Sequence, residues 1–235
     1  MNWRIIHKEV TKSTNLDARG GRPGDVFTAD FQTAGRGRLD HKWVSSRGEN
    51  VIMSVVIDVA DADVAEAATI PLVAGLAVVE AVRELLPEGF EVKLKWPNDV
   101  YVDGRKIAGI LCERHGESVI VGIGVNVAQD SFPPDVDARA VSFRRLGAEA
   151  GVEEVRDAVL GRLSCLVEIW RREGFPALYP RIRAVDFLCA RTIGVKQTDA
   201  DAQPVCGVSG GIMPDGSLDV GGVRVWAGEA HVLLV

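Results

Sequence analysis

This sequence of 235 residues has no long uninterrupted apolar run. None approaches the roughly 18 residues that a membrane-spanning helix needs. The N-terminal stretch MNWRIIHKEVTKSTN also lacks the continuous apolar segment of a secretory signal. We therefore expect a cytoplasmic protein with no membrane partner.

Cysteine is scarce as well. The four cysteines are scattered, with no CxxC pair and no histidine at the spacing of metal ligands. This pattern predicts free thiols in a reducing compartment and no metal site built from protein side chains. The cysteines are Cys112, Cys165, Cys189 and Cys206.

Positive charge is in the minority. The formal net charge is −6 and the sequence pI is about 5.3, which argues against a protein that coats nucleic acid. Apolar residues make up 47% of the chain, which is enough for a large core. The length suits one large domain with a small appendix.

The alternation of polar and apolar residues predicts an α+β fold. Strand-like segments follow one another in a meander, with Asp103-Gly104 as a hairpin turn, which favours a mixed, mostly antiparallel β-sheet. Apolar helical patterns over 62–86 and 152–173 predict helices that flank this sheet. Short strands and glycine turns near the C-terminus predict a small β-barrel. We expect a main domain at 1–184 and the barrel at 185–235.

The segment GRGRLDHKW at 35–43 is cationic in an otherwise acidic chain. Its glycines let the backbone approach a ligand closely, and its arginines offer paired donors to phosphate or carboxylate. Trp43 either anchors the loop in the core or stacks on a planar ring. The loop taken alone is equally well explained as a solvated basic turn.

A second polar cluster, KWPNDV at 95–100, follows an alternating strand. Asn98 and Asp99 present an amide and a carboxylate at the strand end, where sheets often display chemistry. With Lys95 and Lys106 nearby, they resemble a site for an anionic ligand. The alternative is that Asn98 and Asp99 cap a turn and that Lys93 belongs to an exposed face.

Three further segments place isolated polar groups against apolar ones. Lys106 lies in the apolar stretch KIAGI, where Gly109 leaves room beside the strand for a ligand. Asn126 is the sole polar side chain of GIGVNV and must hydrogen-bond either to backbone or to a nucleotide. STN at 13–15 suits the cap of a short helix that begins near Leu16.

Taken in order, these motifs resemble the biotin protein ligase family over nearly the whole chain. The resemblance implies a catalytic domain similar to class II synthetases and biotinyl/lipoyl transferases, followed by an SH3-like barrel. The segments that carry it are STN at 13–15, ADFQTAGRGR at 29–38, Trp43, KWPNDV at 95–100, RKIAGIL at 105–111, GIGVNV at 122–127, and GGIMPDGSLDV and WAGE in the barrel.

This resemblance implies a two-step ligase reaction. Biotin and ATP first form biotinyl-5′-adenylate and pyrophosphate. A lysine of a biotin carboxyl carrier domain, part of a biotin-dependent carboxylase, then attacks the mixed anhydride and releases AMP. The resemblance also implies Mg²⁺ as activator and a cationic loop that closes over the adenylate. A homodimer is the default expectation.

The resemblance assigns roles residue by residue. The implied catalytic residues are Lys106, Arg36, Arg38 and Asp99, with Asp99 assisting deprotonation of the attacking amine. The implied biotin-binding residues are Ser13, Thr14, Asn15, Gln32, Gly35, Arg36, Gly37, Arg38, Lys106 and Gly109. The implied ATP- or adenylate-binding residues are Arg36, Arg38, Trp43, Lys95, Asn98, Asp99, Lys106 and Asn126.

The loop departs from the family pattern at two positions. Asp40 and His41 replace a glycine and an arginine that family loops commonly carry, which predicts that phosphate is held more weakly there or is held by Lys42 instead. Because STN begins at residue 13, we also expect no N-terminal winged helix and therefore no operator-binding function.

Two alternatives remain open. A lipoate- or octanoate-protein ligase or transferase shares the fold, but KWPND and the barrel favour biotin. A non-catalytic nucleotide- or DNA-binding module would use the basic loop alone, and the acidic net charge disfavours it.

Overall fold

The computed structural model describes residues 2–39, 41–197 and 203–233, and its main feature is a seven-stranded sheet. The strand order is β1-β2-β3-β7-β6-β5-β4; β1 and β2 pair in parallel and all other neighbours pair antiparallel. The predicted mixed, mostly antiparallel sheet is therefore confirmed. Its strands are β1 Arg4–Thr11, β2 Asp25–Gln32, β3 Asn50–Asp58, β4 Val92–Lys95, β5 Asp99–Val102, β6 Arg105–His115 and β7 Ser118–Asn126.

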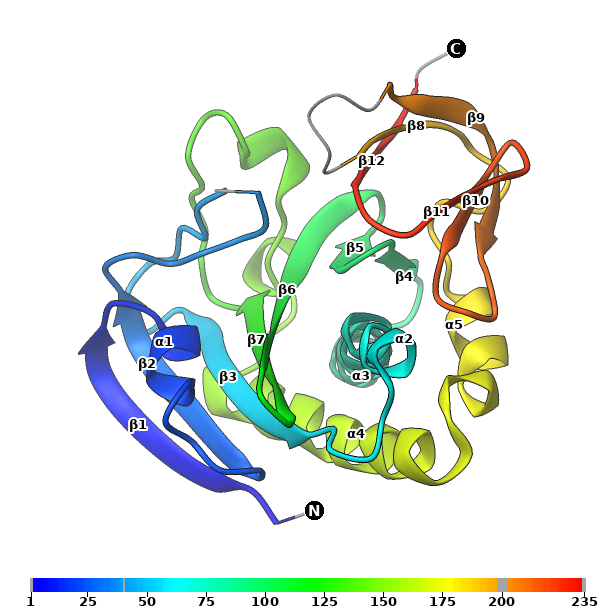
Figure 1. The fold of residues 1–235 in the computed structure, drawn as a ribbon. Helices are drawn as coiled ribbons and strands as arrows, with labels where there is room; N and C mark the ends of the chain where they lie inside the picture. The colour runs from blue at the N-terminus through cyan, green and yellow to red at the C-terminus, as the bar shows by residue number, and fades with distance from the viewer. Residues whose placement is uncertain (1, 40, 198–202, 234–235) are drawn as a thin grey trace.

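The core lies between this sheet and helix α3 (Ile70–Leu85), which Figure 1 shows end-on at the centre of the molecule. Pro71 occupies its first turn, because the missing N–H of proline costs nothing there. The short helix α2 (Val64–Ala67) precedes it, and α4 (Val152–Glu173) packs across it.

Length and composition alone would let the segment Val64–Leu85 cross a membrane, which differs from the expectation that no such stretch exists. Of its most apolar window, 67% is buried inside the molecule. A helix that is apolar on most sides and surrounded by protein is what a core requires. Its hydropathy is therefore explained by packing.

The first helix begins earlier than its sequence pattern predicts. We expected a start near Leu16, but α1 spans Thr14–Ala18 with Ser13 at the cap position, where its side chain makes no capping hydrogen bond. The side chains of Thr14 and Asn15 are buried and bonded to neighbouring strands, which holds both residues in the first turn.

The β5–β6 hairpin turns at Asp103-Gly104, and both residues have positive φ, as a two-residue turn of this kind needs. A register shift between Val100 and Tyr101 places Lys106 opposite Tyr101 and Gly109 opposite Asp99. This shift brings the carboxylate of β5 and the lysine of β6 to the same region of the sheet.

The C-terminal strands form a second sheet of five strands, in the order β11-β10-β9-β8-β12. Strand β9 pairs with β8 through its first half and with β10 through its second half, so the sheet folds over on itself as the predicted small barrel requires. The strands are β8 Thr192–Lys196, β9 Val205–Ile212, β10 Leu218–Val220, β11 Val223–Val225 and β12 Glu229–Val232.

The chain between helix α5 (Tyr179–Ala184) and β8 joins the two sheets. Residues 185–187 pair with Leu94 at the edge of the large sheet. The fully buried carboxylate of Asp186 accepts hydrogen bonds from the backbone N–H groups of Leu188 and Ile212, both at 2.8 Å, and pairs with Arg183 at 3.4 Å. The domain boundary between 184 and 185 stays a prediction.

We predict that Asp186→Ala lowers the free energy of unfolding by about 3 kcal/mol, because it leaves two buried N–H groups and one guanidinium without their acceptor. Urea unfolding followed by tryptophan fluorescence measures this. The matched control is Asp157→Ala on the exposed face of α4, which we expect to change stability by less than about 0.5 kcal/mol. Equal losses in both variants would contradict the role of Asp186.

Candidate active site

The cationic segment 35–43 folds back on itself as a narrow loop. Gly37 N–H donates to the His41 carbonyl at 2.7 Å, and Trp43 N–H donates to the Gly35 carbonyl at 3.1 Å. A side chain at Gly35 would overlap the backbone of Trp43, so this close return needs glycine. Asp40 lies outside the described residues.

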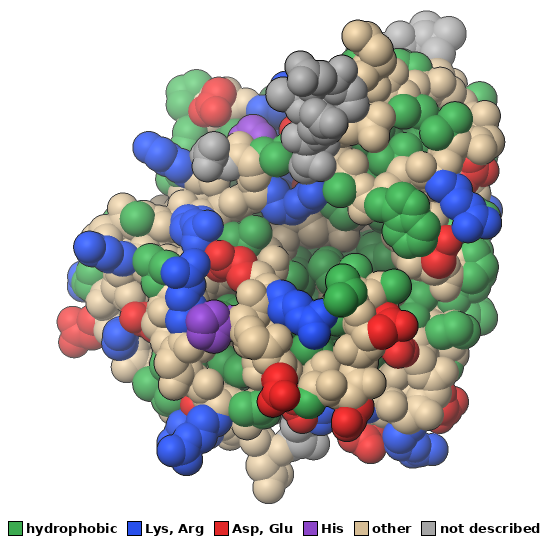
Figure 2. All heavy atoms as spheres, in the orientation of Figure 1, with side chains coloured by type: hydrophobic (Ala, Val, Ile, Leu, Met, Phe, Trp, Pro, Cys, Tyr) green, Lys and Arg blue, Asp and Glu red, His purple; other side chains and the backbone are tan. Residues whose placement is uncertain are grey.

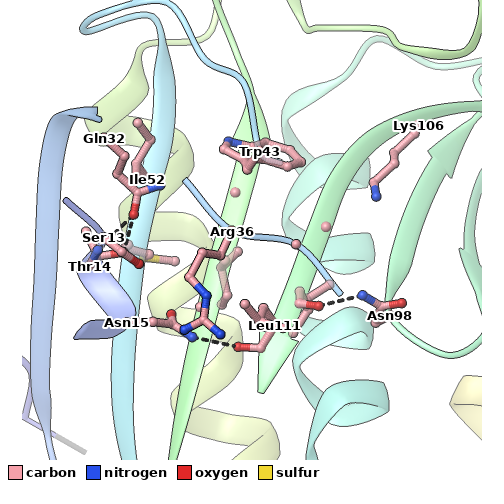
Figure 3. A pocket seen from close by; sticks show the side chains of 17 residues that line it. Ser13, Thr14, Asn15, Gln32, Arg36, Trp43, Ile52, Asn98, Lys106 and Leu111 are labelled. Atoms are coloured by element: carbon pink, nitrogen blue, oxygen red, sulfur yellow. Dashed lines mark hydrogen bonds between the residues drawn. The ribbon is translucent and has the colours of Figure 1, made fainter. Parts of the chain in front are cut away.

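Beneath this loop lies a small cavity of about 60 Å³, here called the inner cavity (Figure 3). Hydroxyl and amide side chains line one end, Lys106 and Asn98 line the other, and Trp43 lies over it. Its lining residues are Ser13, Thr14, Asn15, Gln32, Arg36, Gly37, Trp43, Ile52, Met53, Asn98, Lys106, Gly109, Ile110, Leu111, Gly122, Ile123 and Gly124.

The polar end of the inner cavity is already hydrogen-bonded internally. Gln32 Oε1 accepts from the backbone N–H of Thr14 at 2.8 Å. Asn15 Nδ2 donates to Glu113 Oε2 at 2.7 Å, and Ser54 Oγ lies 2.7 Å from Thr14 Oγ1 and 2.6 Å from Asn15 Oδ1. These bonds hold the hydroxyls and amides in defined orientations at the cavity wall.

Three glycines make room for this cavity. Gly124 lies under the indole ring of Trp43, where an added Cβ would sit 2.5 Å from Cε2. An added Cβ at Gly109 would lie 3.2 Å from Lys106 Nζ, and one at Gly122 would overlap Asn15. The indole N–H of Trp43 is buried without a hydrogen-bond partner among the described residues, so it is available to a ligand.

Lys106 and Asp99 form the charged centre of the site. Lys106 Nζ lies 2.6 Å from Asp99 Oδ1, and the ammonium also lies 6.0 Å from the centroid of the Trp43 ring. The backbone of Lys106 pairs with the segment 140–141. A partnered but half-buried lysine is placed to approach an anionic ligand.

A wider cavity of about 480 Å³ adjoins the inner one and shares Trp43, Asn98 and Lys106 with it. Lys95, Arg139 and Arg38 give its wall positive charge. Burial lowers the pKa of Lys95 below its ordinary 10.5, and burial likewise lowers the pKa of Arg38. Such weakly solvated cations bind anions more strongly than exposed ones do.

The tyrosine and the acidic groups of the wide cavity limit its charge. Burial, with a smaller contribution from Asp99, raises the pKa of Tyr101 to about 12, so its hydroxyl stays neutral. Asp99, Asp135 and Glu229 supply carboxylates around the same space. The C-terminal sheet contributes Glu229, Ala230 and His231 to this wall.

The loop also contacts the C-terminal sheet. Arg38 Nη1 donates to the carbonyl of Gly228 at 3.0 Å, and His41 Nε2 lies 3.7 Å from Glu229. Figure 2 shows this face hollowed near its middle, with blue Lys and Arg side chains on the margin. A groove of about 830 Å³ runs there between the loop, Pro97 and the exposed Trp226.

The structure brings most of the predicted site residues to these cavities, with two changes in their surroundings. Asn98 Nδ2 donates to the carbonyl of Ile110 at 2.6 Å, and Asn126 Nδ2 donates to the carbonyl of Val141 at 3.0 Å. Both side-chain amides therefore hydrogen-bond to backbone carbonyls and stabilise the local backbone conformation. Gly35 lines only the outer groove, and Lys93 pairs with Glu91 at 3.7 Å, as an exposed face predicts.

Several site residues were missed by the sequence analysis. Ser54 is the sole hydroxyl in the apolar strand β3, the same signal that singled out Asn126. Glu113, near the end of β6, and Arg139 gave no such signal, whereas Glu229 ends the WAGE segment, to which no site role was assigned.

A small polar cavity and a wide cationic one thus meet at a single lysine, Lys106. The model of the biotin/lipoate A/B protein ligase family matches residues 8–130. A biotin--[acetyl-CoA-carboxylase] ligase of Mycobacterium tuberculosis is 36% identical over 97% of this chain and 88% of that protein. The chain belongs to the biotin/lipoate A/B protein ligase family.

Two further relatives agree with this assignment. The bifunctional ligase/repressor BirA of Salmonella typhimurium is 30% identical over 93% of this chain and 71% of that protein. The solved structure of a biotin protein ligase from Aquifex aeolicus in complex with biotin and ATP superposes with a TM-score of 0.85. It is 26% identical and covers 97% of this chain and 99% of that one.

We predict that Gly124→Ala weakens binding of biotin roughly tenfold or more, because the added methyl occupies the floor of the inner cavity against the Trp43 ring. Isothermal titration calorimetry measures the affinity. Gly161→Ala adds the same methyl in α4, where nothing lies within 4 Å, and should leave binding unchanged. Unchanged affinity in the Gly124 variant would contradict the packing argument.

Proposed function

We propose that this protein is an ATP-dependent biotin protein ligase. It activates the carboxylate of biotin as biotinyl-5′-adenylate and then transfers biotin to a lysine of a biotin carboxyl carrier domain. The observation that carries the proposal is the meeting of the inner and wide cavities at Lys106. Family membership and the match to a ligase solved with biotin and ATP support it.

Each cavity suits one substrate. The hydroxyls and amides of the inner cavity complement a ring that carries both N–H and C=O groups. The wide cavity has the size and the positive wall that a nucleotide triphosphate needs. With the acid in the first and ATP in the second, the acid carboxylate and the α-phosphate meet beside Lys106.

Charge governs the first step. When the carboxylate oxygen attacks the α-phosphorus, negative charge collects on the phosphate oxygens as pyrophosphate departs. Lys106, Arg36 and Arg38 stabilise that charge, and Lys95 holds the nucleotide. Asp99 keeps the Lys106 ammonium in place at 2.6 Å and then takes part in deprotonating the acceptor amine.

The carboxylates of the wide cavity suit Mg²⁺, which binds few protein oxygens and shares the remaining ones with substrate phosphates. Asp99, beside Lys106, would supply one such oxygen. No cluster of three or more metal-ligating side chains occurs among the described residues. The ion, bound with ATP, supplies additional charge neutralisation at the phosphates.

The inner cavity is too small for a two-ring acid in this arrangement, since 60 Å³ holds only a few water molecules. Binding therefore requires this cavity to widen, and the loop closes again over the adenylate and excludes water. A homodimer and a cytoplasmic location are further parts of the proposal. A lipoate- or octanoate-protein ligase is the alternative within the family.

The first test is exchange of labelled pyrophosphate into ATP. We predict that the wild type catalyses exchange that requires biotin and that lipoate does not support. Lys106→Ala should reduce it about 100- to 1,000-fold, because a cation beside the developing charge is removed. Lys93→Ala, on β4 and outside the cavities, is the control. Exchange supported by lipoate would identify the alternative ligase.

We also predict a pH dependence of ATP binding that arises from Lys95. Because burial lowers the pKa of Lys95, its charge is lost at a lower pH than that of an ordinary lysine. The KM for ATP should therefore rise on the alkaline side. Lys95→Arg should shift that rise to higher pH, whereas Lys93→Arg should not. Identical profiles for all three proteins would contradict the assignment of Lys95.

A further inference from the structure

Four buried or partly buried polar side chains form a hydrogen-bonded chain that starts outside the inner cavity and ends at its wall. Glu113 Oε2 accepts from Asn15 Nδ2 at 2.7 Å. Asn15 Oδ1 lies 2.6 Å from Ser54 Oγ, which lies 2.7 Å from Thr14 Oγ1. Asn15, Ser54 and Thr14 are each buried, so water does not compete for these bonds. Among the four, only Thr14 and Asn15 reach the cavity.

The carboxylate of Glu113 determines which way the Asn15 amide faces. A carboxylate only accepts hydrogen bonds, so the NH₂ group of Asn15 must face it. The carbonyl of Leu111, 3.3 Å from the same nitrogen, is also only an acceptor. The amide oxygen of Asn15 therefore faces Ser54.

The orientation of Asn15 determines which groups donate and which accept as far as the cavity wall, because each hydroxyl has a single proton. Asn15 Oδ1 cannot donate, so the single hydroxyl proton of Ser54 is directed to it. Ser54 then has only lone pairs left for Thr14. The Thr14 hydroxyl has two acceptors within reach, Ser54 Oγ at 2.7 Å and Gln32 Oε1 at 3.2 Å, and its proton is used on the protein side with either one. Thr14 Oγ1 is thereby left as an acceptor at the cavity wall.

Gln32 completes the pattern beside Thr14. Its Oε1 accepts from the backbone N–H of Thr14 at 2.8 Å, so its NH₂ group remains as a donor. Beside Thr14 the wall thus presents Thr14 Oγ1 as an acceptor and Gln32 Nε2 as a donor. A cyclic urea offers an N–H and a C=O to match them, whereas a dithiolane ring offers neither.

We propose that Glu113, acting through Asn15 and Ser54, sets the hydrogen-bond polarity of the inner cavity and thereby selects an acid with a cyclic urea over one with a dithiolane ring. This inference rests on the proposed function. Glu113 and Ser54 are positioning residues, because they act on the ligand through Asn15 and Thr14.

Two arginines near the second carboxylate oxygen of Glu113 stabilise its negative charge. Burial opposes ionisation, but the hydrogen bond from Asn15 and the Arg36 guanidinium outweigh it and hold the pKa of Glu113 below its usual value. Arg36 Nη1 lies 3.1 Å and Arg19 Nη2 lies 3.4 Å from Glu113 Oε1. A ligand without matching groups leaves the buried donor and acceptor unpaired. The free-energy cost of those unpaired groups strongly disfavours binding of such a ligand.

The test compares Ser54→Ala, Glu113→Gln and the double variant. Ser54→Ala breaks the chain without touching Arg36. Glu113→Gln replaces an acceptor-only group by an amide that can also donate, so residue 113 no longer enforces the orientation of Asn15. Calorimetry with biotin and with desthiobiotin, which keeps the urea ring, gives the affinities, and the KM for ATP reports on the rest of the site. Glu117→Gln, an exposed position in the β6–β7 turn, removes the same charge as a control.

We expect each single variant to weaken binding of both urea ligands roughly tenfold or more, with little change in the KM for ATP. Because both residues act through one chain, the double variant should bind no more weakly than the weaker single variant. Unchanged affinity in either single variant, or losses that multiply in the double variant, would overturn the proposal. Absence of biotin binding by the wild type would instead overturn the proposed function itself.

Discussion

The salt bridge between the ammonium of Lys106 and the carboxylate of Asp99 keeps both charged groups in the sheet. A lysine is tolerated among the apolar residues of β6 only because a carboxylate lies 2.6 Å away. The register shift in the β5–β6 hairpin brings the two strands into that relation, and Gly109 leaves space where the lysine side chain passes. The inner and wide cavities meet at this pair, so the whole site is organised around it.

An acidic protein builds a cationic site by bringing basic side chains from separate parts of the chain to one place. Arg36 and Arg38 come from the loop, Lys95 and Lys106 from the sheet, and Arg139 from the segment after β7. Local charge, held in partly buried surroundings, decides what binds there, because exposed charges elsewhere are screened. The C-terminal sheet adds to the same wall through Glu229 and holds the loop through the carbonyl of Gly228.

Much of this arrangement could be predicted from the sequence, since local signals specify it. The Asp103-Gly104 turn, the strand end at KWPND and the helix over 152–173 all depend on neighbours in the chain. The early start of α1 and the contribution of Glu113 could not be predicted, because both depend on contacts across about a hundred residues. Ser54 is an intermediate case. A lone hydroxyl in an apolar strand can be recognised in the sequence, but its hydrogen-bond partners cannot.

The three glycines at Gly109, Gly122 and Gly124 give the inner cavity its shape by the atoms that they lack. Substitutions at these three positions therefore cannot enlarge the pocket for bulkier acids, because glycine has no side chain to shorten. Additional space has to come from shortening Trp43, Ile52 or Met53 on the other walls. The floor of the cavity is consequently the part of the site that tolerates the fewest substitutions, although its glycines have no functional side chains.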